Sequence, residues 1–418
     1  MSSPARKKTF LSLLAMFCVG MLLRVQYELK TPFLARNHDV EGHIRYLQYV
    51  LSHWSIPPPH GGWEFFQPPL YYFLAAVAYR VGGFFGVHIH VFAPVQFLSL
   101  LLSLGTLAAG IWIGTLLFPQ GKSRTALFVY SAIIATFPSL AFLSSRISND
   151  VGVQCMAFLA LGFLLRWWQG RRTRDWWFFS LSLAVGMLMK SNILLLYPAA
   201  VFSVFLANRL SLREKFLFLL QNVSILFIID GWFFIPRFLA ERDERLAFVG
   251  NLTRNIGYVP FHIRDFFTFN PLRVLAHPYL NPAHYISNFW GYFLRSAFFD
   301  NFKNGGHFQP LAMIILGIGM ALIVLLLRML ILDVQRGAQS MSAPLWLVFF
   351  FHIAGAVVYR IVGPYLPDGN FRFVIVLVVP CAFYIVSGFG RLQTFIEKLH
   401  FVLACAFVLL CGMYLLVI

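Results

Sequence analysis

The chain has 418 residues, of which 59% are hydrophobic and only 12% are charged, and 47 of them are phenylalanine. This composition excludes an ordinary soluble globular protein. The net charge of +17 would suggest a nucleic-acid partner for a soluble protein, but in a membrane protein the side on which each Lys and Arg lies decides its meaning. We therefore expect an all-α, multi-pass membrane protein that binds no nucleic acid.

Apolar stretches recur along the whole chain, and many have the length of about 18 to 25 residues that a helix needs to cross roughly 30 Å of hydrocarbon. The first follows a basic N-terminus, and no small-residue cleavage site comes after it, so we expect it to stay uncleaved. A single membrane domain over residues 1–418 accounts for these stretches. We predict about eleven transmembrane helices, at residues 9–27, 92–118, 125–145, 151–168, 175–189, 193–207, 216–236, 310–331, 344–361, 372–388 and 400–418.

Residues 67–86 decide the predicted topology, because they are apolar enough to cross the membrane but contain Arg80, three glycines and a pair of prolines. If they do not cross, six basic segments lie on the side of the N-terminus and hold 16 of the 33 Lys and Arg residues, as the positive-inside rule requires of the cytoplasm. We therefore predict an interfacial helix here and a cytoplasmic N-terminus in the cell membrane. Two long loops, at 28–91 and 237–309, then lie on the extracytoplasmic side.

The first of these loops holds a dense group of titratable residues in a chain with only 16 acids. Asp39 stands where a helix would begin, and residues 40, 44, 47 and 51 form an apolar stripe suited to a membrane surface. A spacing of four residues places Asp39 beside His43, with Tyr46 on the same side, whereas Glu41 lies on the opposite face. Asp39 therefore either caps the helix or acts in catalysis with His43; a divalent metal bound by both is a third interpretation.

An aromatic segment braced by prolines follows this helix, with the sequence SIPPPHGGWEFFQPP at residues 55–69. Aromatic rings beside polar groups are surfaces on which sugar rings can stack, but aromatic side chains also anchor proteins at membrane interfaces. We take Trp63, the interleaved Glu64 and Gln67, and Tyr71 just beyond them as candidates for substrate binding.

Further candidates follow later in the chain. Arg146 and Asp150 flank the turn between the third and fourth predicted spans, where Asp150 could equally cap the fourth helix. Lys190 lies between two spans of only about 22 Å each; below the membrane surface it needs an anion or a water-filled cavity, or it must snorkel to the interface. Arg360 and Arg372 lie near the mouth of the tenth span, and Arg suits bidentate phosphate binding.

Five groups of motifs, in this order, resemble the C superfamily of membrane glycosyltransferases, in the family-39-like branch that includes bacterial protein mannosyltransferases and lipid A aminoarabinose transferase. The resemblance covers about residues 5–390, and the first group is the most specific. The motifs are HDVEGHIRYLQYV with GWEFFQPPLYYFLAA, then SRISND, then GMLMKSN with a following YP, then FTFNP with HPY and FWGYFLRSAFFDNF, and finally NFRFVIVLVVP.

The resemblance implies a polyprenyl-phosphate-linked sugar as donor, an inverting transfer on the extracytoplasmic face, and a catalytic acid in the first loop that matches Asp39. It also implies that residues 67–86 form a juxtamembrane helix of that loop. One departure concerns Glu41, because many relatives have an adjacent Asp-Glu pair where this chain has Asp39-Val40-Glu41. The role of Glu41 is therefore left open.

We accordingly expect a hexosyl- or pentosyl-type glycosyltransferase that moves the sugar to a hydroxyl group of a lipid or glycan, or of a protein. Asp39 would act as general base with His43. Lys190 and Arg372, helped by Arg146 or Arg360, would neutralise the departing phosphate. No cofactor is required by these steps, although a divalent metal stays open.

The alternative is a transporter or flippase of a polyprenyl-linked glycan. Internal repeats, broken helices and ion sites near the midplane are typical of transporters. The sequence has no convincing repeat, and Asp230 is the only acid well inside a predicted span. Transfer chemistry is therefore the favoured interpretation.

Overall fold

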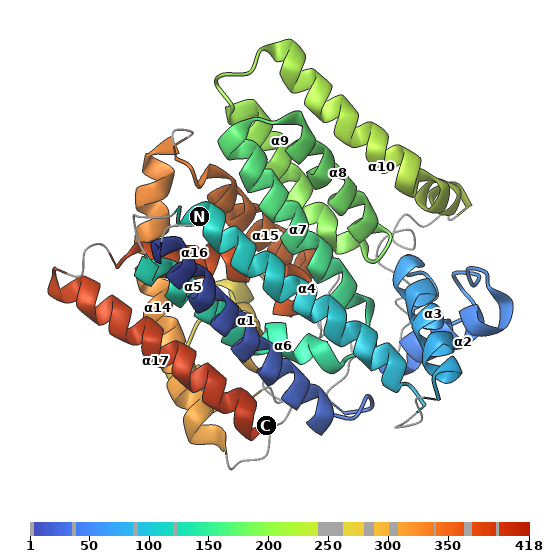
Figure 1. Ribbon diagram of the computed structural model, residues 1–418, viewed down its shortest axis with the longest axis horizontal. Coiled ribbons are helices and arrows are strands. Elements are labelled where there is room, and N and C mark those ends of the chain that lie inside the picture. Colours follow the sequence, from blue (N-terminus) through green and yellow to red (C-terminus); the bar gives the residue numbers. More distant parts are fainter. Residues whose placement is uncertain are drawn as a thin grey trace. The chain divides into compact units, whose positions relative to one another are not determined.

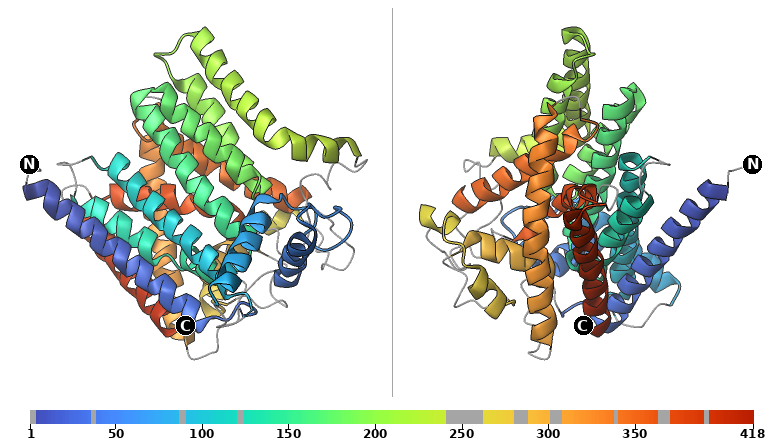
Figure 2. Two further views of the ribbon diagram at one scale, coloured as in Figure 1. Left: turned by 45° about the vertical axis from the view of Figure 1, so that its right-hand side comes forward. Right: turned by 90° about the vertical axis from the view of Figure 1, so that its left-hand side faces the viewer.

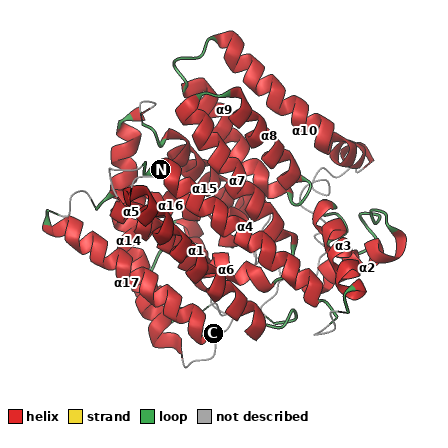
Figure 3. Ribbon diagram, in the orientation of Figure 1, coloured by secondary structure: helices red, strands yellow, loops and turns green. Residues whose placement is uncertain are grey.

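A computed structural model describes residues 4–35, 39–86, 91–119, 124–240, 262–279, 288–300, 308–337, 340–362, 370–389 and 393–418. This part of the chain contains helices, turns and loops but no strand, as Figure 3 shows. The predicted all-α fold is thus confirmed. Much of the predicted second loop, residues 237–309, lies outside the described residues.

The α-helices follow the apolar stretches of the sequence (Figure 1). Short 3-10 helices precede or follow some of them: η1 (Leu143–Ser145), η2 (Ser191–Leu195), η3 (Ile263–Phe266) and η8 (Phe371–Leu377). The α-helices are α1 (Pro4–Lys30), α2 (Val40–His53), α3 (Leu70–Phe84), α4 (Ala93–Leu117), α5 (Arg124–Thr136), α6 (Pro138–Phe142), α7 (Asn149–Gly170), α8 (Thr173–Met187), α9 (Leu196–Leu206), α10 (Leu212–Ala240), α12 (Pro271–Ala276), α13 (Phe289–Phe299), α14 (Gln309–Gln335), α15 (Ala343–Val362), α16 (Val378–Ser387) and α17 (Phe395–Val417).

Each of the eleven predicted spans coincides with helical structure, but they differ in length. Seven helices of the described part are long and apolar enough to cross a membrane. An eighth span results if the segments Arg124–Thr136 and Pro138–Ser145, bent by 48° against each other, count as one; Pro138 causes the break because it cannot continue the hydrogen-bond ladder. The other three predicted spans lie on shorter helices, so a multi-pass fold is confirmed and the number eleven is not.

The chain divides into two compact units. Unit 1 comprises residues 1–27, 110–141 and 256–418, and unit 2 comprises residues 28–109 and 142–255. The predicted candidates of the first loop, the turn at Asp150 and the turn at Lys190 all fall in unit 2, whereas Arg360 and Arg372 fall in unit 1. Each unit is described by itself.

Unit 2 is built around α7, α8 and α10, which run side by side in Figures 1 and 2. The short connection after α7 is stabilised by Arg171, whose guanidinium lies 3.9 Å from the ring centroid of Trp168. Trp176 of α8 donates a hydrogen bond to the carbonyl of Phe218 on α10 at 2.8 Å. Antiparallel helices joined by short turns thus bring the Asp150 end of α7 close to the Lys190 end of α8.

The first loop of unit 2 forms a helical hairpin of α2 and α3. Tyr46 of α2 stacks on Tyr72 of α3, with ring centroids 3.6 Å apart. At the other end, the guanidinium of Arg80 lies 4.7 Å from the Trp54 ring and donates to the carbonyl of Leu51. With 15 residues, α3 is not among the described helices that are long and apolar enough to cross. Its place at the membrane interface stays a prediction.

In unit 1, α14, α16 and α17 pack together with α5. A buried carboxylate ties several of these elements, because Asp333 accepts hydrogen bonds from Ser342 at 2.8 Å, Ser340 at 2.6 Å and Tyr384 at 2.9 Å. These three hydrogen bonds all come from hydroxyl groups, and they stabilise the carboxylate in its buried position.

Candidate functional site

Asp39 lies at the start of α2 in an unusual backbone conformation. Its φ of 54° and ψ of 22° are left-handed, and its side chain makes no capping hydrogen bond. A capping Asp normally has extended dihedral angles and accepts a bond from the second or third backbone N–H of the helix. The capping interpretation is therefore wrong, and an exposed carboxylate is held in a conformation that is uncommon for a residue with a side chain.

The two faces of α2 separate the titratable residues as the helical period predicts. His43 is only 3% exposed, whereas the Glu41 side chain is 78% exposed and lies 2.5 Å from Arg45, one turn further on. Exposed pairs of this kind contribute little to stability. Glu41 therefore has an ordinary surface environment, and His43 has a buried one.

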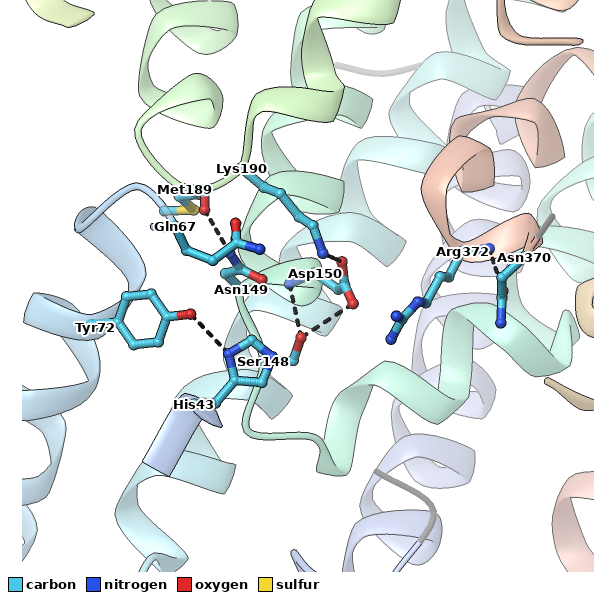
Figure 4. A network of polar contacts seen from close by, with 10 residues as sticks. All are labelled: His43, Gln67, Tyr72, Ser148, Asn149, Asp150, Met189, Lys190, Asn370 and Arg372. Carbon is cyan, nitrogen blue, oxygen red and sulfur yellow. Dashed lines mark hydrogen bonds and ion pairs between the residues drawn. The ribbon is translucent and has the colours of Figure 1, made fainter. Parts of the chain in front are cut away.

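The partner of His43 is Tyr72, which the sequence did not single out. Nδ1 of His43 lies 2.8 Å from the Tyr72 hydroxyl, and the imidazole tautomer decides which of the two donates (Figure 4). Burial, reinforced by the nearby Glu64 carboxylate, raises the pKa of Tyr72 well above its usual value. Tyr72 is thus a neutral phenol that fixes the histidine ring.

Glu64 is the second carboxylate of the site with a left-handed backbone, at a φ of 68°, and it is only 5% exposed. Gly42 allows it to approach α2, because a Cβ at this glycine would lie 2.7 Å from Cγ of Glu64 and would collide with the Trp63 ring. The absence of a side chain beside His43 is therefore what lets the aromatic segment close over the helix.

The turn before α7 shows which residue caps this helix, and it is not Asp150. Ser148 is the N-cap residue, and its hydroxyl accepts a bond from the Asp150 backbone N–H at 3.2 Å. The Asp150 carboxylate instead lies 2.5 Å from Nζ of Lys190, whose side chain is 12% exposed (Figure 4). Lys190 therefore has an anion partner rather than a snorkelling geometry, and this anion is a protein carboxylate.

Asn149 joins three segments that are far apart in the sequence. Its Nδ2 donates to Oε1 of Gln67 at 3.1 Å and to the carbonyl of Met189 at 3.0 Å (Figure 4). The other amide atom, Oδ1, is buried and has no hydrogen-bond partner within the described residues. These hydrogen bonds thus hold the first loop, the start of α7 and the turn at Lys190 together.

Arg146, Tyr71 and Tyr46 are buried deeper than a substrate contact would require. Tyr71 is fully buried, and its hydroxyl lies 3.3 Å from Ser99, which donates to the Arg146 carbonyl at 2.5 Å. The Tyr46 hydroxyl donates to the carbonyl of Gln67 at 3.2 Å. These residues, with Gln67 itself, pack the interior of unit 2, and only Trp63 among the aromatic candidates is half-buried.

A further cation supports the proline segment. Arg237, near the end of α10, donates to the carbonyls of Phe66 at 3.1 Å and Pro57 at 3.5 Å, and its guanidinium lies 4.2 Å from the Phe233 ring. This role could not be predicted from the sequence, because the contacts join residues about 170 positions apart. Loop carbonyls of the 57–66 segment are thus anchored to a membrane helix.

In unit 1, Arg372 is the second residue of η8. Asn370, the N-cap residue, accepts a bond from the Arg372 backbone N–H at 2.8 Å (Figure 4) and donates to Oδ1 of Asp300 at 3.1 Å. The Arg372 guanidinium lies 4.9 Å from the Phe373 ring. Arg360 is half-buried in the last turn of α15. Arg360 and Arg372 thus both lie at the ends of helices.

Metal binding is the remaining interpretation of the Asp39 and His43 pair. Among the described residues, no group of three or more His, Cys, Asp or Glu side chains is placed to hold a metal ion. Asp39 and His43 therefore gain no third ligand of these types from the described part of the chain.

Comparisons with known proteins give one family and a set of solved structures. A family model described as dolichyl-phosphate-mannose-protein mannosyltransferase matches residues 67–233. The crystal structure of the Archaeoglobus fulgidus oligosaccharyltransferase in complex with Zn and sulfate aligns with a TM-score of 0.53 and 13% identity, over 96% of this chain and 53% of its own. No curated protein matches in sequence.

Two other structures of the A. fulgidus enzyme give the same result. The apo form aligns with a TM-score of 0.51, and AglB in complex with an inhibitory peptide and a dolichol-phosphate aligns with a TM-score of 0.52. Both are 12% identical and align over 97% of this chain and 56% of theirs. This chain therefore spans about half the length of the structures it matches. The likeness to these structures shows a shared fold, and the family model matches less than half of the chain.

Proposed function

We propose that the protein transfers a sugar, with inversion, from a polyprenyl-phosphate donor to an acceptor hydroxyl on the extracytoplasmic face of the membrane. The observation that carries the proposal is the left-handed backbone of Asp39, one helical turn before the buried His43–Tyr72 pair. Strained backbone of this kind is concentrated at functional sites. The mannosyltransferase family match and the dolichol-phosphate complex of the structural relative support this class of donor.

In the proposed reaction, the acceptor oxygen attacks the anomeric carbon of the sugar while the bond from that carbon to the phosphate oxygen breaks. Asp39 accepts the proton of the acceptor hydroxyl as general base. His43, fixed by Tyr72, orients this carboxylate or shares its proton. The leaving group is a phosphate monoester with a second pKa near 6, so it departs largely as an anion and needs no general acid.

Within unit 2, positive charge at the phosphate is assigned to Lys190. An ammonium group has three donors, so Lys190 can keep one bond to Asp150 and donate the others to a phosphate oxygen. Asp150 then holds the cation in position rather than competing for it. Such preorganised charge is what the developing phosphate needs.

Among the predicted substrate contacts, we assign Trp63 to stacking on the sugar or the acceptor, because it is half-buried. Buried Tyr46, Gln67 and Tyr71 are assigned to positioning the loop. Glu64 is assigned to the site through its approach to Gly42 and Tyr72. Glu41 is assigned no role in the reaction and serves as the control carboxylate in the mutational test.

The acceptor is proposed to be a lipid or a glycan. The second extracytoplasmic loop has only the residues 237–309, which is short for a separate module that would dock a large protein substrate. A hydroxyl carried by a membrane-bound acceptor can reach the site without such a module. If radiolabelled sugar enters the protein fraction rather than the lipid or glycan fraction, this assignment is wrong.

The function is tested with the purified chain and a panel of radiolabelled polyprenyl-phosphate sugars. Asp39→Asn should lower transfer by about 10²- to 10⁴-fold, because Asn fits a left-handed backbone but is not a base. Glu41→Gln is the matched control and should keep wild-type transfer. The proposal fails if folded wild type transfers none of the sugars, and the base is misassigned if Glu41→Gln is inactive while Asp39→Asn is not.

A further inference from the structure

A cavity of about 310 Å³ opens between α1 and α5 in unit 1, far along the chain from every residue of the proposed site. Lys8, Thr9 and Ser12 line it from α1, and Arg124, Thr125 and Phe128 line it from α5. Two helices thus each bring one cation to the same cavity. The positive-inside rule assigns this end of both helices to the cytoplasmic side of the membrane.

Both cations lie near the N-terminal ends of their helices. Arg124 is the first residue of α5, and Lys8 lies in the second turn of α1. The positive partial charge of a helix N-terminus is confined to the first turn, where an anion stabilises and a cation does not. An anion in the cavity would therefore offset the charges of Lys8 and Arg124 and the positive end of α5.

The walls of the cavity change from polar to apolar along the helices. Thr9 and Thr125 supply hydroxyl groups beside the cations, and Ser12 already donates to the Lys8 carbonyl at 3.0 Å. Leu13, Leu127 and Phe128 form the apolar part of the wall, and Phe128 is 43% exposed. A ligand that fits has an anionic end next to the hydroxyl groups and an apolar body that lies along these apolar side chains.

We propose that this cavity binds an anionic glycerophospholipid, such as phosphatidylglycerol, from the cytoplasmic leaflet. Its phosphate lies between Lys8 and Arg124, and its acyl chains extend along Leu13 and Phe128. Basic pockets between membrane helices on the cytoplasmic side recognise headgroups by the same chemistry. The site is separate from the proposed transfer reaction, so each can be right without the other.

The test uses the full-length chain in neutral detergent, with lipid binding counted by native mass spectrometry. Wild type should retain phosphatidylglycerol in preference to phosphatidylcholine. The double variant Lys8→Gln/Arg124→Gln should bind phosphatidylglycerol about tenfold or more weakly, since each basic residue near a headgroup contributes severalfold. Lys8→Gln and Arg124→Gln should each lose part of this affinity when introduced alone. Lys8→Arg should keep it.

Two controls make the result specific. Arg213→Ala removes an exposed cation in the first turn of α10, outside the cavity, and should leave binding unchanged. Inorganic phosphate at millimolar concentration should not displace the lipid, because it has no acyl chains. Equal binding of phosphatidylglycerol by wild type and by the folded single variants overturns the proposal, as does displacement by phosphate alone or an equal loss in Arg213→Ala.

Discussion

At the scale of single residues, two carboxylates of unit 2 have a strained backbone. Asp39 and Glu64 have positive φ values, as do Trp54, Arg171 and Asp300 among the other described non-glycine residues. Each such residue costs of order 1–3 kcal/mol unless its surroundings hold it. Backbone conformations with this energetic cost persist where function requires a particular orientation of the side chain. For this reason we propose Asp39 as the catalytic residue.

Relieving this strain should separate stability from activity. Asp39→Gly should raise the free energy of unfolding by up to about 1 kcal/mol, because glycine adopts a left-handed backbone without cost, yet it should abolish transfer. Asp39→Ala should be both inactive and less stable than Asp39→Gly. Thermal unfolding in detergent checks the order. A glycine variant no more stable than the alanine variant would show that Asp39 carries no strain.

The glycine of α2 provides a second residue-scale test. Gly42→Ala should destabilise by about 1–3 kcal/mol and lower transfer, because the added Cβ displaces Trp63 and Glu64. Gly83→Ala is the matched control in α3, where an added Cβ meets no atom within 4 Å, and it should be neutral or slightly stabilising. The same loss in both variants would mean that the packing at Gly42 is not special.

The buried phenol of Tyr72 should set the pH dependence of transfer through His43. Because the pKa of Tyr72 is raised well above its usual value, it stays neutral across the working pH range. Tyr72→Phe removes its bond to His43 and should lower the maximal rate by about tenfold, with a shifted pH–rate profile. Tyr46→Phe, which loses only a bond to the Gln67 carbonyl, should leave the profile unshifted. Identical profiles in all three proteins would limit Tyr72 to packing.

At the scale of elements, the Lys190 turn and the start of α7 are joined by one buried ion pair. Asp150→Asn or Lys190→Met alone should cost about 3–5 kcal/mol, because each leaves an uncompensated buried charge. The double variant Asp150→Asn/Lys190→Met should recover most of this stability but bind the donor weakly, since the phosphate contact is gone. Donor binding at wild-type strength in the stable double variant would remove Lys190 from the phosphate site.

The sequence allowed the elements and the faces of α2 to be predicted, but not the contacts between elements. Helical periodicity separates Glu41 from His43 because it is a local property of one helix. The partners Tyr72, Asn149 and Arg237 could not be found this way, because their bonds join residues between about 30 and 170 positions apart. An anion was one of three alternatives for Lys190, and its identity depends on how α7 packs against α8.

At the scale of the whole molecule, helix length limits the number of membrane crossings, and the distribution of charge predicts the topology. Helices α8, η2–α9 and η8–α16 are shorter than a full span, so hydropathy alone does not decide whether they cross. The distribution of 16 of the 33 cations over six short segments gives a direction to the chain that helix lengths cannot give.

This topology is tested by labelling single cysteines in intact cells. If α3 does not cross the membrane, cysteines that replace exposed Gly61 and Val91 lie on the same side, before and after this helix. Both should react with a membrane-impermeant maleimide added outside, whereas a cysteine at Arg213 should react only after permeabilisation. Labelling of Gly61→Cys and Val91→Cys from opposite sides would mean that α3 is a span. The basic segments after it would then face away from the N-terminus, against the charge rule.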